Sequence, residues 1–192
     1  MADSPLDLLL SRRSVKFVQA PGPNEESLDL ILRAAMRAPD HGRLRPWRFK
    51  LIRGEAIGRL ADLAFAASEA AGRPLTPEKI ASTRRWLAQV PLLIAIAAYI
   101  DHPQSKIRDE EKLLATGAAV TNMLNAAHML GFGAFWSTGL GTYVEAVPEA
   151  LGFDPLETRF MGYLALGTPI DAAANAAERP EPAAYVSEWK GV

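Results

Sequence analysis

Two arginine-rich segments in the first quarter of the chain are the first candidates for chemistry. Residues 11–14 read SRRS, and residues 36–47 read MRAPDHGRLRPW, with three arginines, a histidine and a tryptophan around two prolines. Guanidinium groups match the oxygens of a phosphate bidentately, and a serine hydroxyl adds a further donor. Flat heteroaromatic ligands are held by donors around their edge and by apolar groups on their faces. The first segment therefore suits a phosphate, and the second suits a flat ligand.

Both segments also have an explanation that needs no ligand. Arg12 and Arg13 follow the end of a predicted helix, and Arg37 lies in the last turn of another. Basic side chains at the carboxyl end of a helix complement its dipole. His41 follows a Pro-Asp pair and suits an exposed turn. The residue types alone leave both interpretations open.

A glycine-rich segment, GFGAFWSTGLG at 131–141, is the third candidate. It contains two G-x-G pieces, but a dinucleotide fingerprint needs a strand before its glycines and a helix after them. Here a predicted helix precedes the glycines and a predicted strand follows, so we reject that assignment. The STGLG portion is better explained as a glycine turn whose backbone N–H groups approach a ligand closely.

Composition excludes several classes of function. Lys and Arg number 21 against 22 Asp and Glu, and the chain has no cysteine. The balanced charge argues against binding to nucleic acid or to an anionic membrane, and the absent thiols exclude disulfides and thiol catalysis. No histidine pair has metal-ligand spacing, so we expect no metal. The longest apolar stretch, at 91–100, is too short to span a membrane. We therefore expect a soluble, cytoplasmic protein.

The elements that must position these segments follow from periodicity and caps. Ser4-Pro5 starts a short helix with Leu6, Leu9 and Leu10 on one face, and Asn24 caps the second helix. We predict helices at 5–11, 25–36, 55–70, 76–89, 108–130 and 144–151, and strands at 47–54, 91–100, 133–137 and 160–167. The uniformly apolar 91–100 segment predicts a central strand buried on both sides. The chain is thus one α+β or α/β domain.

Taken in order, these pieces resemble the nitroreductase family of FMN-dependent oxidoreductases, in its short single-domain branch. The resemblance rests on LLLSRRSVKFV, ILRAAMRAPDHGRLRPWRF, GAAVTNMLNAAHMLGFG, AFWSTG and MGYLALGTP, which span nearly the whole chain. It implies an α+β sandwich with a central, mostly antiparallel sheet flanked by helices, in an intertwined homodimer. Residues 1–192 would form one FMN-binding domain, with 168–192 as an extension that wraps the partner subunit.

The resemblance also implies three groups of FMN contacts. The group that binds the phosphate and ribityl chain is Arg12, Arg13 and Ser14. The group that reaches the flavin from across the subunit interface is Arg37 and His41. The group beside the isoalloxazine ring is Trp136, Ser137, Thr138 and Gly139. No residue is assigned as a catalytic acid or base, because the flavin itself carries the hydride chemistry.

The activity that the resemblance implies is ping-pong reduction of small electron-poor acceptors, such as nitroaromatics, quinones or enones, with NADH or NADPH as donor. Residues 68–86 are the candidate substrate lid. Two alternatives stay open: a low-turnover flavin-binding or storage protein, and a specialised flavin-dependent dehydrogenase of the same fold.

Some positions depart from the family pattern. Arg45 stands where many members have glutamine before the Pro-Trp pair, and 136–138 reads Trp-Ser-Thr where short relatives often read Trp-Arg-Ser. Arg179 and Lys190 lack the setting of the basic carboxyl-terminal residues that larger members place on the phosphate. The expected flavin contact at Arg45 is therefore in doubt.

Overall fold

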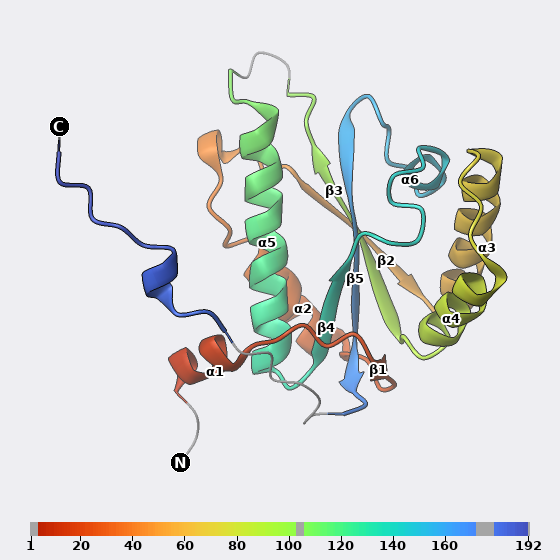
Figure 1. Ribbon diagram of the computed structural model, residues 1–192, viewed down its shortest axis with the longest axis horizontal. Helices are drawn as coiled ribbons and strands as arrows, with labels where there is room; N and C mark the ends of the chain where they lie inside the picture. Colours follow the sequence, from red (N-terminus) through yellow and green to blue (C-terminus); the bar gives the residue numbers. More distant parts are fainter. Residues whose placement is uncertain (1–3, 103–105, 172–178, 192) are drawn as a thin grey trace.

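An antiparallel sheet lies in the middle of the fold (Figure 1). The computed structural model describes residues 4–102, 106–171 and 179–191, and in these ranges the sheet has five strands. They are β1 (Val18–Gln19), β2 (Trp47–Arg53), β3 (Leu92–Tyr99), β4 (Gly133–Ser137) and β5 (Thr158–Pro169). The order is β1-β5-β3-β2, with β4 also paired to β5, so the last strand in sequence has three partners.

The sheet is buried on both faces, as its central strand shows. Along β3, Leu92, Ile94 and Ile96 pack into one hydrophobic cluster, and the alternate residues from Leu93 to Ala97 pack into the other. Successive strand residues point to opposite faces, so a strand without polar alternation must be covered twice. This confirms the central position predicted for the 91–100 segment.

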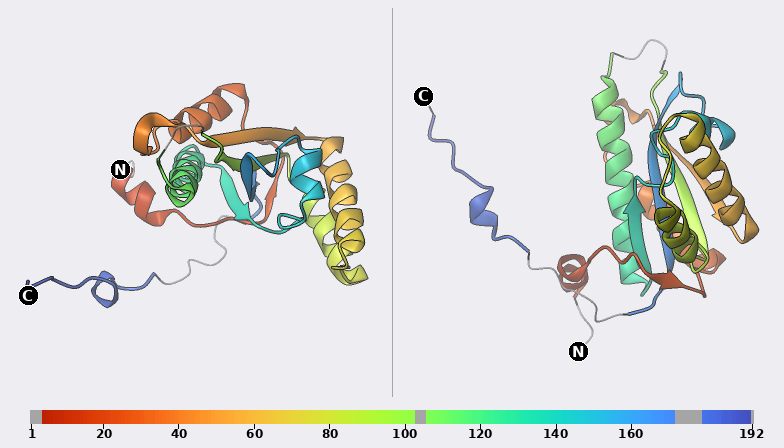
Figure 2. Two further views of the ribbon diagram at one scale, coloured as in Figure 1. Left: turned by 90° about the horizontal axis from the view of Figure 1, so that it is seen from above. Right: turned by 45° about the vertical axis from the view of Figure 1, so that its right-hand side comes forward.

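Two groups of helices cover these faces (Figures 1 and 2). On one side lie α2 and the long α5, and on the other lie α3, α4 and the short α6. The short α1 packs beside α5. The bounds are α1 (Pro5–Ser11), α2 (Glu25–Ala35), α3 (Glu55–Ala70), α4 (Pro77–Leu87), α5 (Asp109–Met129) and α6 (Ala146–Ala150). Each face of the sheet therefore has its own core.

Local signals fix the helix ends. Ser4 and Asp7 form a reciprocal capping box at α1, and the Asn24 side chain accepts a hydrogen bond from the Ser27 backbone N–H at α2. Gly131, at a φ of +82°, ends α5, since the left-handed region suits glycine. No described helix is long and apolar enough to cross a membrane.

The structure differs from the predicted elements in three places. A short strand, β1, was missed because a two-residue strand carries no periodic pattern. β5 extends to Pro169 rather than ending at 167, since β1 pairs with Thr168 and Pro169. The apolar face of α1 is exposed, with 60% and 69% of Leu6 and Leu10 accessible. The chain thus leaves an apolar helix face uncovered beside α5.

Candidate functional site

The carboxyl end of α5 meets the end of α1 in a cluster that we name the basic end: Arg12, Arg13, His128 and Arg179. His128 Nε2 lies 3.1 Å from the Ser11 hydroxyl oxygen. Burial lowers the pKa of His128, and the positive charges of Arg12 and Arg13 lower it further. Two of the predicted phosphate residues therefore act together on the same histidine, and positive potential accumulates there.

Arg12 itself is incompletely satisfied. Its Nη1 atom is buried and has no hydrogen-bond partner within the described parts of the chain. Buried polar groups are almost always paired, because an unpaired one forfeits its hydration without compensation. An orphaned guanidinium nitrogen among other cations suits an anion with several acceptor oxygens, such as a phosphate.

Arg179 also belongs to this cluster, although it lies near the carboxyl end of the chain. Its Nη2 donates to the Arg12 carbonyl oxygen over 3.1 Å, so a residue near the carboxyl end adds a third guanidinium. The two residues are 167 positions apart, and no local pattern in the sequence could have paired them. The fold therefore places a basic residue from near the carboxyl end beside Arg12.

The segment after α1 runs from the basic end along the start of β4. The Val15 backbone N–H donates to the Ala134 carbonyl oxygen over 2.9 Å, and Ser14 is exposed. Thus β4 leads from the predicted phosphate residues to the predicted ring residues, within one chain.

The end of β4 carries the other predicted group. Trp136 is half-buried, and its Nε1 donates to the Met161 carbonyl oxygen over 2.8 Å. The Ser137 hydroxyl oxygen accepts from the Gly139 backbone N–H over 3.1 Å. Gly162, at a φ of +95°, lets β5 approach so closely that a Cβ there would lie 2.3 Å from the Ser137 carbonyl oxygen. The turn is thus held in place, with Thr138 exposed.

At its amino end α5 carries a second charged cluster, which we name the paired end: His41, Asp109, Glu111 and Lys112. His41 lies in a short 3-10 helix (His41–Arg43), and its Nδ1 is 2.6 Å from Glu111 Oε2. The hydrogen bond with His41 is the main cause that lowers the pKa of Glu111. The other predicted residue of this group, Arg37, is exposed nearby in sequence.

Lys112 is the buried member of the paired end. Its Nζ donates to the Ile100 carbonyl oxygen over 2.6 Å and to Asp109 Oδ1 over 3.0 Å. A lysine that is only 5% exposed must find such partners. Residues 108–110 are exposed, whereas Lys112 is buried and ties α5 to the end of β3.

The three predicted groups do not form one site in a single chain. The basic end adjoins His128 and the paired end adjoins Glu111, which lie about 26 Å apart along α5 at about 1.5 Å per residue. The structure brings Arg12, Arg13 and Ser14 to the strand that carries Trp136, Ser137, Thr138 and Gly139. It leaves His41 at the far end of the helix, whereas Arg37 follows the end of α2, where the Asn122 side chain in the middle of α5 donates to the Ala34 carbonyl oxygen.

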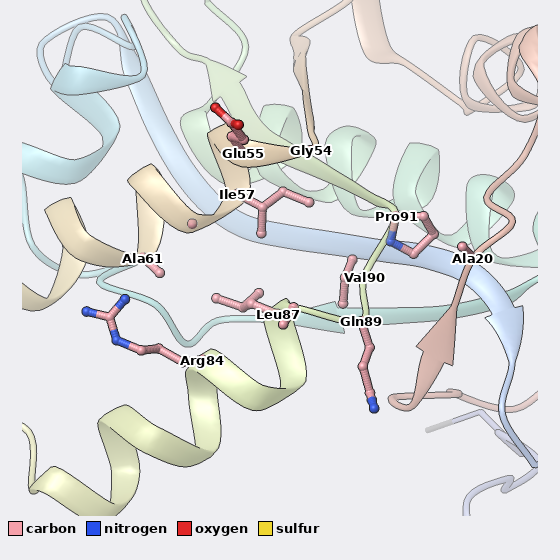
Figure 3. A pocket seen from close by; sticks show the side chains of 12 residues that line it. Ala20, Gly54, Glu55, Ile57, Ala61, Arg84, Leu87, Gln89, Val90 and Pro91 are labelled. Carbon is pink, nitrogen blue, oxygen red and sulfur yellow. The ribbon is translucent and has the colours of Figure 1, made fainter.

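A separate cavity of about 540 Å³ lies between the amino end of α3 and the carboxyl end of α4 (Figure 3). Its charged lining residues are Glu55 and Arg84, and both are already paired, with Arg59 at 3.2 Å and Asp62 at 2.5 Å. None of the nine predicted flavin residues lines it. This cavity is therefore not the site that the sequence predicts.

Comparisons with known proteins bear on the whole chain. Residues 9–168 match the profile described as the Nitroreductase family. The "Putative NAD(P)H nitroreductase YdjA" of Escherichia coli (strain K12) is 36% identical over 182 residues, covering 95% of this chain and 97% of that protein.

Solved structures agree with the observed architecture. The nitroreductase-like family protein from Bacillus cereus has a TM-score of 0.80 at 25% identity, covering 100% of this chain and 98% of that one. A "putative nitroreductase in complex with FMN" from Desulfovibrio desulfuricans has a TM-score of 0.73 at 25% identity, with 98% of each chain covered. These likenesses confirm the predicted α+β fold with an antiparallel sheet between helices.

Proposed function

Because this chain belongs to the nitroreductase family, we propose that it is an FMN-dependent oxidoreductase that uses NADH or NADPH to reduce small electron-poor acceptors. Nitroaromatics, quinones and enones are the acceptor classes we propose. The observation that carries the proposal is the buried Arg12 nitrogen that has no partner among the described residues, in a chain similar to a protein described with FMN.

The residues of the basic end fit the phosphate of FMN. Arg12 offers a buried nitrogen that lacks a partner among the described residues, and Arg13 stands beside it at the same histidine. The exposed Ser14 adds a hydroxyl donor. A dianionic phosphate would supply acceptors for these donors and neutralise charges that now depress the pKa of His128.

The turn after β4 suits the isoalloxazine ring. Ser137 and Gly139 are held by their mutual hydrogen bond, and Trp136 is fixed through Met161. A turn locked in this way keeps its backbone donors in place without reordering when a ligand binds. We assign Trp136, Ser137, Thr138 and Gly139 to the ring side of the site.

A second copy of the chain would complete the site. FMN is shorter than the separation of the two ends of α5, so His41 can reach a flavin at the basic end only from another subunit, and we group Arg37 with it. In a two-fold dimer with antiparallel α5 helices, the paired end of one subunit lies beside the basic end of the other. Leu114, near the amino end of α5, is 72% exposed, and the apolar face of α1 is uncovered near the other end of the helix, as such an interface requires.

The carboxyl-terminal segment also favours a dimer. Residues 179–191 extend away from the body of the chain (Figures 1 and 2), with Tyr185 and Trp189 76% and 84% exposed. Large aromatic side chains left in water typically mark a surface that another chain covers. We propose that this segment embraces the partner subunit.

When bound, FMN supplies the hydride chemistry between the nicotinamide and the acceptor. The chain's own contribution is binding and orientation: Arg12 and Arg13 anchor one end of the cofactor, and the locked turn at Ser137–Gly139 faces the other. No proton needs to be held by a side chain at the reacting atoms, so none is assigned.

The test begins with colour and binding. We expect a yellow protein whose apo form binds FMN more tightly than riboflavin, which lacks the phosphate. Anaerobic NADPH or NADH should bleach the bound flavin rapidly, and light scattering should give the mass of a dimer. A colourless protein that leaves FMN fluorescence unchanged would refute the cofactor assignment. A yellow protein that no nicotinamide bleaches would favour the storage alternative.

A further inference from the structure

A cavity of about 250 Å³ adjoins the turn that follows β4. Thr138 and Gly139, which the proposed function places beside the flavin, form part of its wall. The opposite wall comes from the end of α3, the loop after it and the start of α4, within the candidate lid at 68–86. A reactant in this cavity would therefore lie between the lid and the proposed flavin position.

Charge in this cavity is of one sign. Its charged lining residues are Arg73 and Lys79, and no carboxylate lines it. Neither side chain forms an ion pair or a hydrogen bond with any described residue. Arg84, farther along α4, is by contrast paired with Asp62 and lies over the ring of Phe65. Arg84, outside the cavity, is thus neutralised by a carboxylate on α3, whereas Arg73 and Lys79, inside it, have no such partner among the described residues.

The rest of the lining is apolar or hydroxylated. Phe65, Leu75 and Leu140 supply apolar surface, and Thr83 supplies a hydroxyl. An apolar wall favours a carbon framework over a free inorganic ion, while the two cations favour a negative group on that framework. The cavity therefore suits a small apolar molecule that carries an anionic group.

The wall formed by the turn is preformed. Leu140 has a φ of +53°, a left-handed conformation that a leucine seldom adopts. Its carbonyl oxygen accepts from the Tyr163 hydroxyl over 3.3 Å, and the Thr142 hydroxyl donates to the Gly139 carbonyl oxygen over 2.6 Å. Strained backbone of this kind persists only where its surroundings hold it, and it occurs preferentially at ligand sites.

We propose that Arg73 and Lys79 select reactants with an anionic group, a carboxylate or a phosphate, for the oxidoreductase site described above. This inference rests on the proposed function for the reaction, and on the cavity alone for the charge preference. The anionic group has two possible sources: a carboxylate on the acceptor, or the additional phosphate that distinguishes NADPH from NADH.

The experiment compares matched reactants in the FMN-loaded protein. The acceptors are 4-nitrobenzoate and nitrobenzene, which differ by one carboxylate, and the donors are NADPH and NADH. The variants are Lys79→Ala and Arg73→Ala, with Lys79→Arg as the conservative change. Arg85→Ala is the control, since Arg85 is an exposed cation on α4 that does not line the cavity.

Lys79→Ala should raise the KM of the anionic member of one pair by about tenfold or more, as expected for loss of a charge-assisted contact. The neutral or less charged member, and kcat, should change little. A selective effect on 4-nitrobenzoate identifies an acceptor carboxylate, and a selective effect on NADPH identifies its phosphate. Lys79→Arg should retain the preference. The proposal is overturned if Lys79→Ala changes the KM of both members of each pair equally or changes neither. It is also overturned if Arg85→Ala has the same effect as Lys79→Ala.

Calorimetric titration of the purified protein with 4-nitrobenzoate separates this inference from the proposed function. If the protein proves colourless and inert, tighter binding to the wild type than to Lys79→Ala still supports the anion-selective cavity. If the protein is yellow and active, but neither 4-nitrobenzoate nor NADPH binds the wild type more tightly than Lys79→Ala in such titrations, the flavin assignment stands and the cavity assignment fails.

Discussion

Both ends of α5 carry clusters of charged side chains, but the two clusters differ in how far their charges are neutralised by partners. At the paired end His41 meets Glu111, and the buried Lys112 meets Asp109 and a backbone carbonyl. At the basic end Arg12 keeps a buried nitrogen that has no partner among the described residues, beside a histidine whose pKa is lowered.

The difference separates charges that serve the fold from charges that await a ligand. Cations at the paired end are satisfied by their own chain, so they stabilise it without further binding. At the basic end Arg12 and Arg13 disfavour the charged form of His128, and a buried Arg12 nitrogen has no partner among the described residues, which lowers stability unless an anion binds. Real proteins concentrate such local inconsistencies at functional sites. The basic end is therefore where we expect substitutions to alter binding, and the paired end is where we expect them to alter folding.

The largest effect is expected from Arg12→Ala. Loss of one charge-assisted phosphate contact should weaken FMN binding by about 1.5–3 kcal/mol, roughly 10- to 150-fold in Kd. Fluorescence titration of the apo protein measures this directly. Riboflavin affinity should barely change, because riboflavin has no phosphate.

Arg33→Ala is the matched control for charge. Arg33 is an exposed arginine on α2 that pairs with Asp29, away from the basic end. Its removal should leave the Kd for FMN unchanged. Equal losses in the two variants would mean that net charge, and not the basic end, governs binding.

Lys112→Met tests the paired end. The substitution keeps the length of the side chain but removes the charged donor of the Ile100 carbonyl oxygen, which then keeps only the His102 backbone N–H. We expect the free energy of unfolding to fall by about 1–3 kcal/mol in a denaturant titration, the cost of losing a buried hydrogen bond from a charged donor. The exposed Lys106 provides the control, as Lys106→Met. If the denaturation midpoint is unchanged or raised, the free-energy cost of burying the Lys112 charge equals or exceeds what its hydrogen bonds contribute to stability.

The smallest effect, a shift in titration, concerns His128. Its pKa lies below the ordinary 6.5 in the folded chain, so the unfolded chain binds this proton first as the pH falls. The stability linked to His128 is therefore complete above pH 6.5 and declines below it. FMN should raise the pKa of His128 toward its ordinary value, because the phosphate offsets Arg12 and Arg13.

The measurement is an NMR titration of the His128 imidazole, with His128→Gln to assign the resonance. Riboflavin should leave the titration where it is in the apo protein. If riboflavin and FMN shift the pKa of His128 by the same amount, the FMN phosphate does not bind at the basic end, even if FMN binds well.

Local features of the fold could be predicted from sequence, and long-range ones could not. Ser4, Asn24 and Gly131 mark helix ends through bonds to near neighbours, and the apolar run in β3 requires cover on both sides. The contacts that form the charged clusters at the two ends of α5 join residues far apart in sequence. His41 and Glu111 are 70 positions apart, and Arg12 and Arg179 are 167 positions apart. No periodicity encodes such pairs.

The candidate site shows the same limit. The residue types of the SRRS segment left both a phosphate and a helix dipole open, and only the fold reveals a buried Arg12 nitrogen without a partner among the described residues. The cations Arg73 and Lys79 sit in an ordinary polar loop and helix start in the sequence. They become notable only because the fold brings the turn after β4 opposite them.

The central place of β5 has a consequence for the order in which this protein forms. β5 is the last strand to be synthesised, yet β1, β3 and β4 all pair with it, and Val18 pairs with Pro169. Contacts over such separations require long loops to close before they stabilise anything. β4, which lies beside the segment after Arg12–Ser14, therefore gains its partner β5 only when most of the chain has left the ribosome. The proposed phosphate-binding residues are made first and assembled last, so at the proposed site FMN would bind only after the sheet is complete.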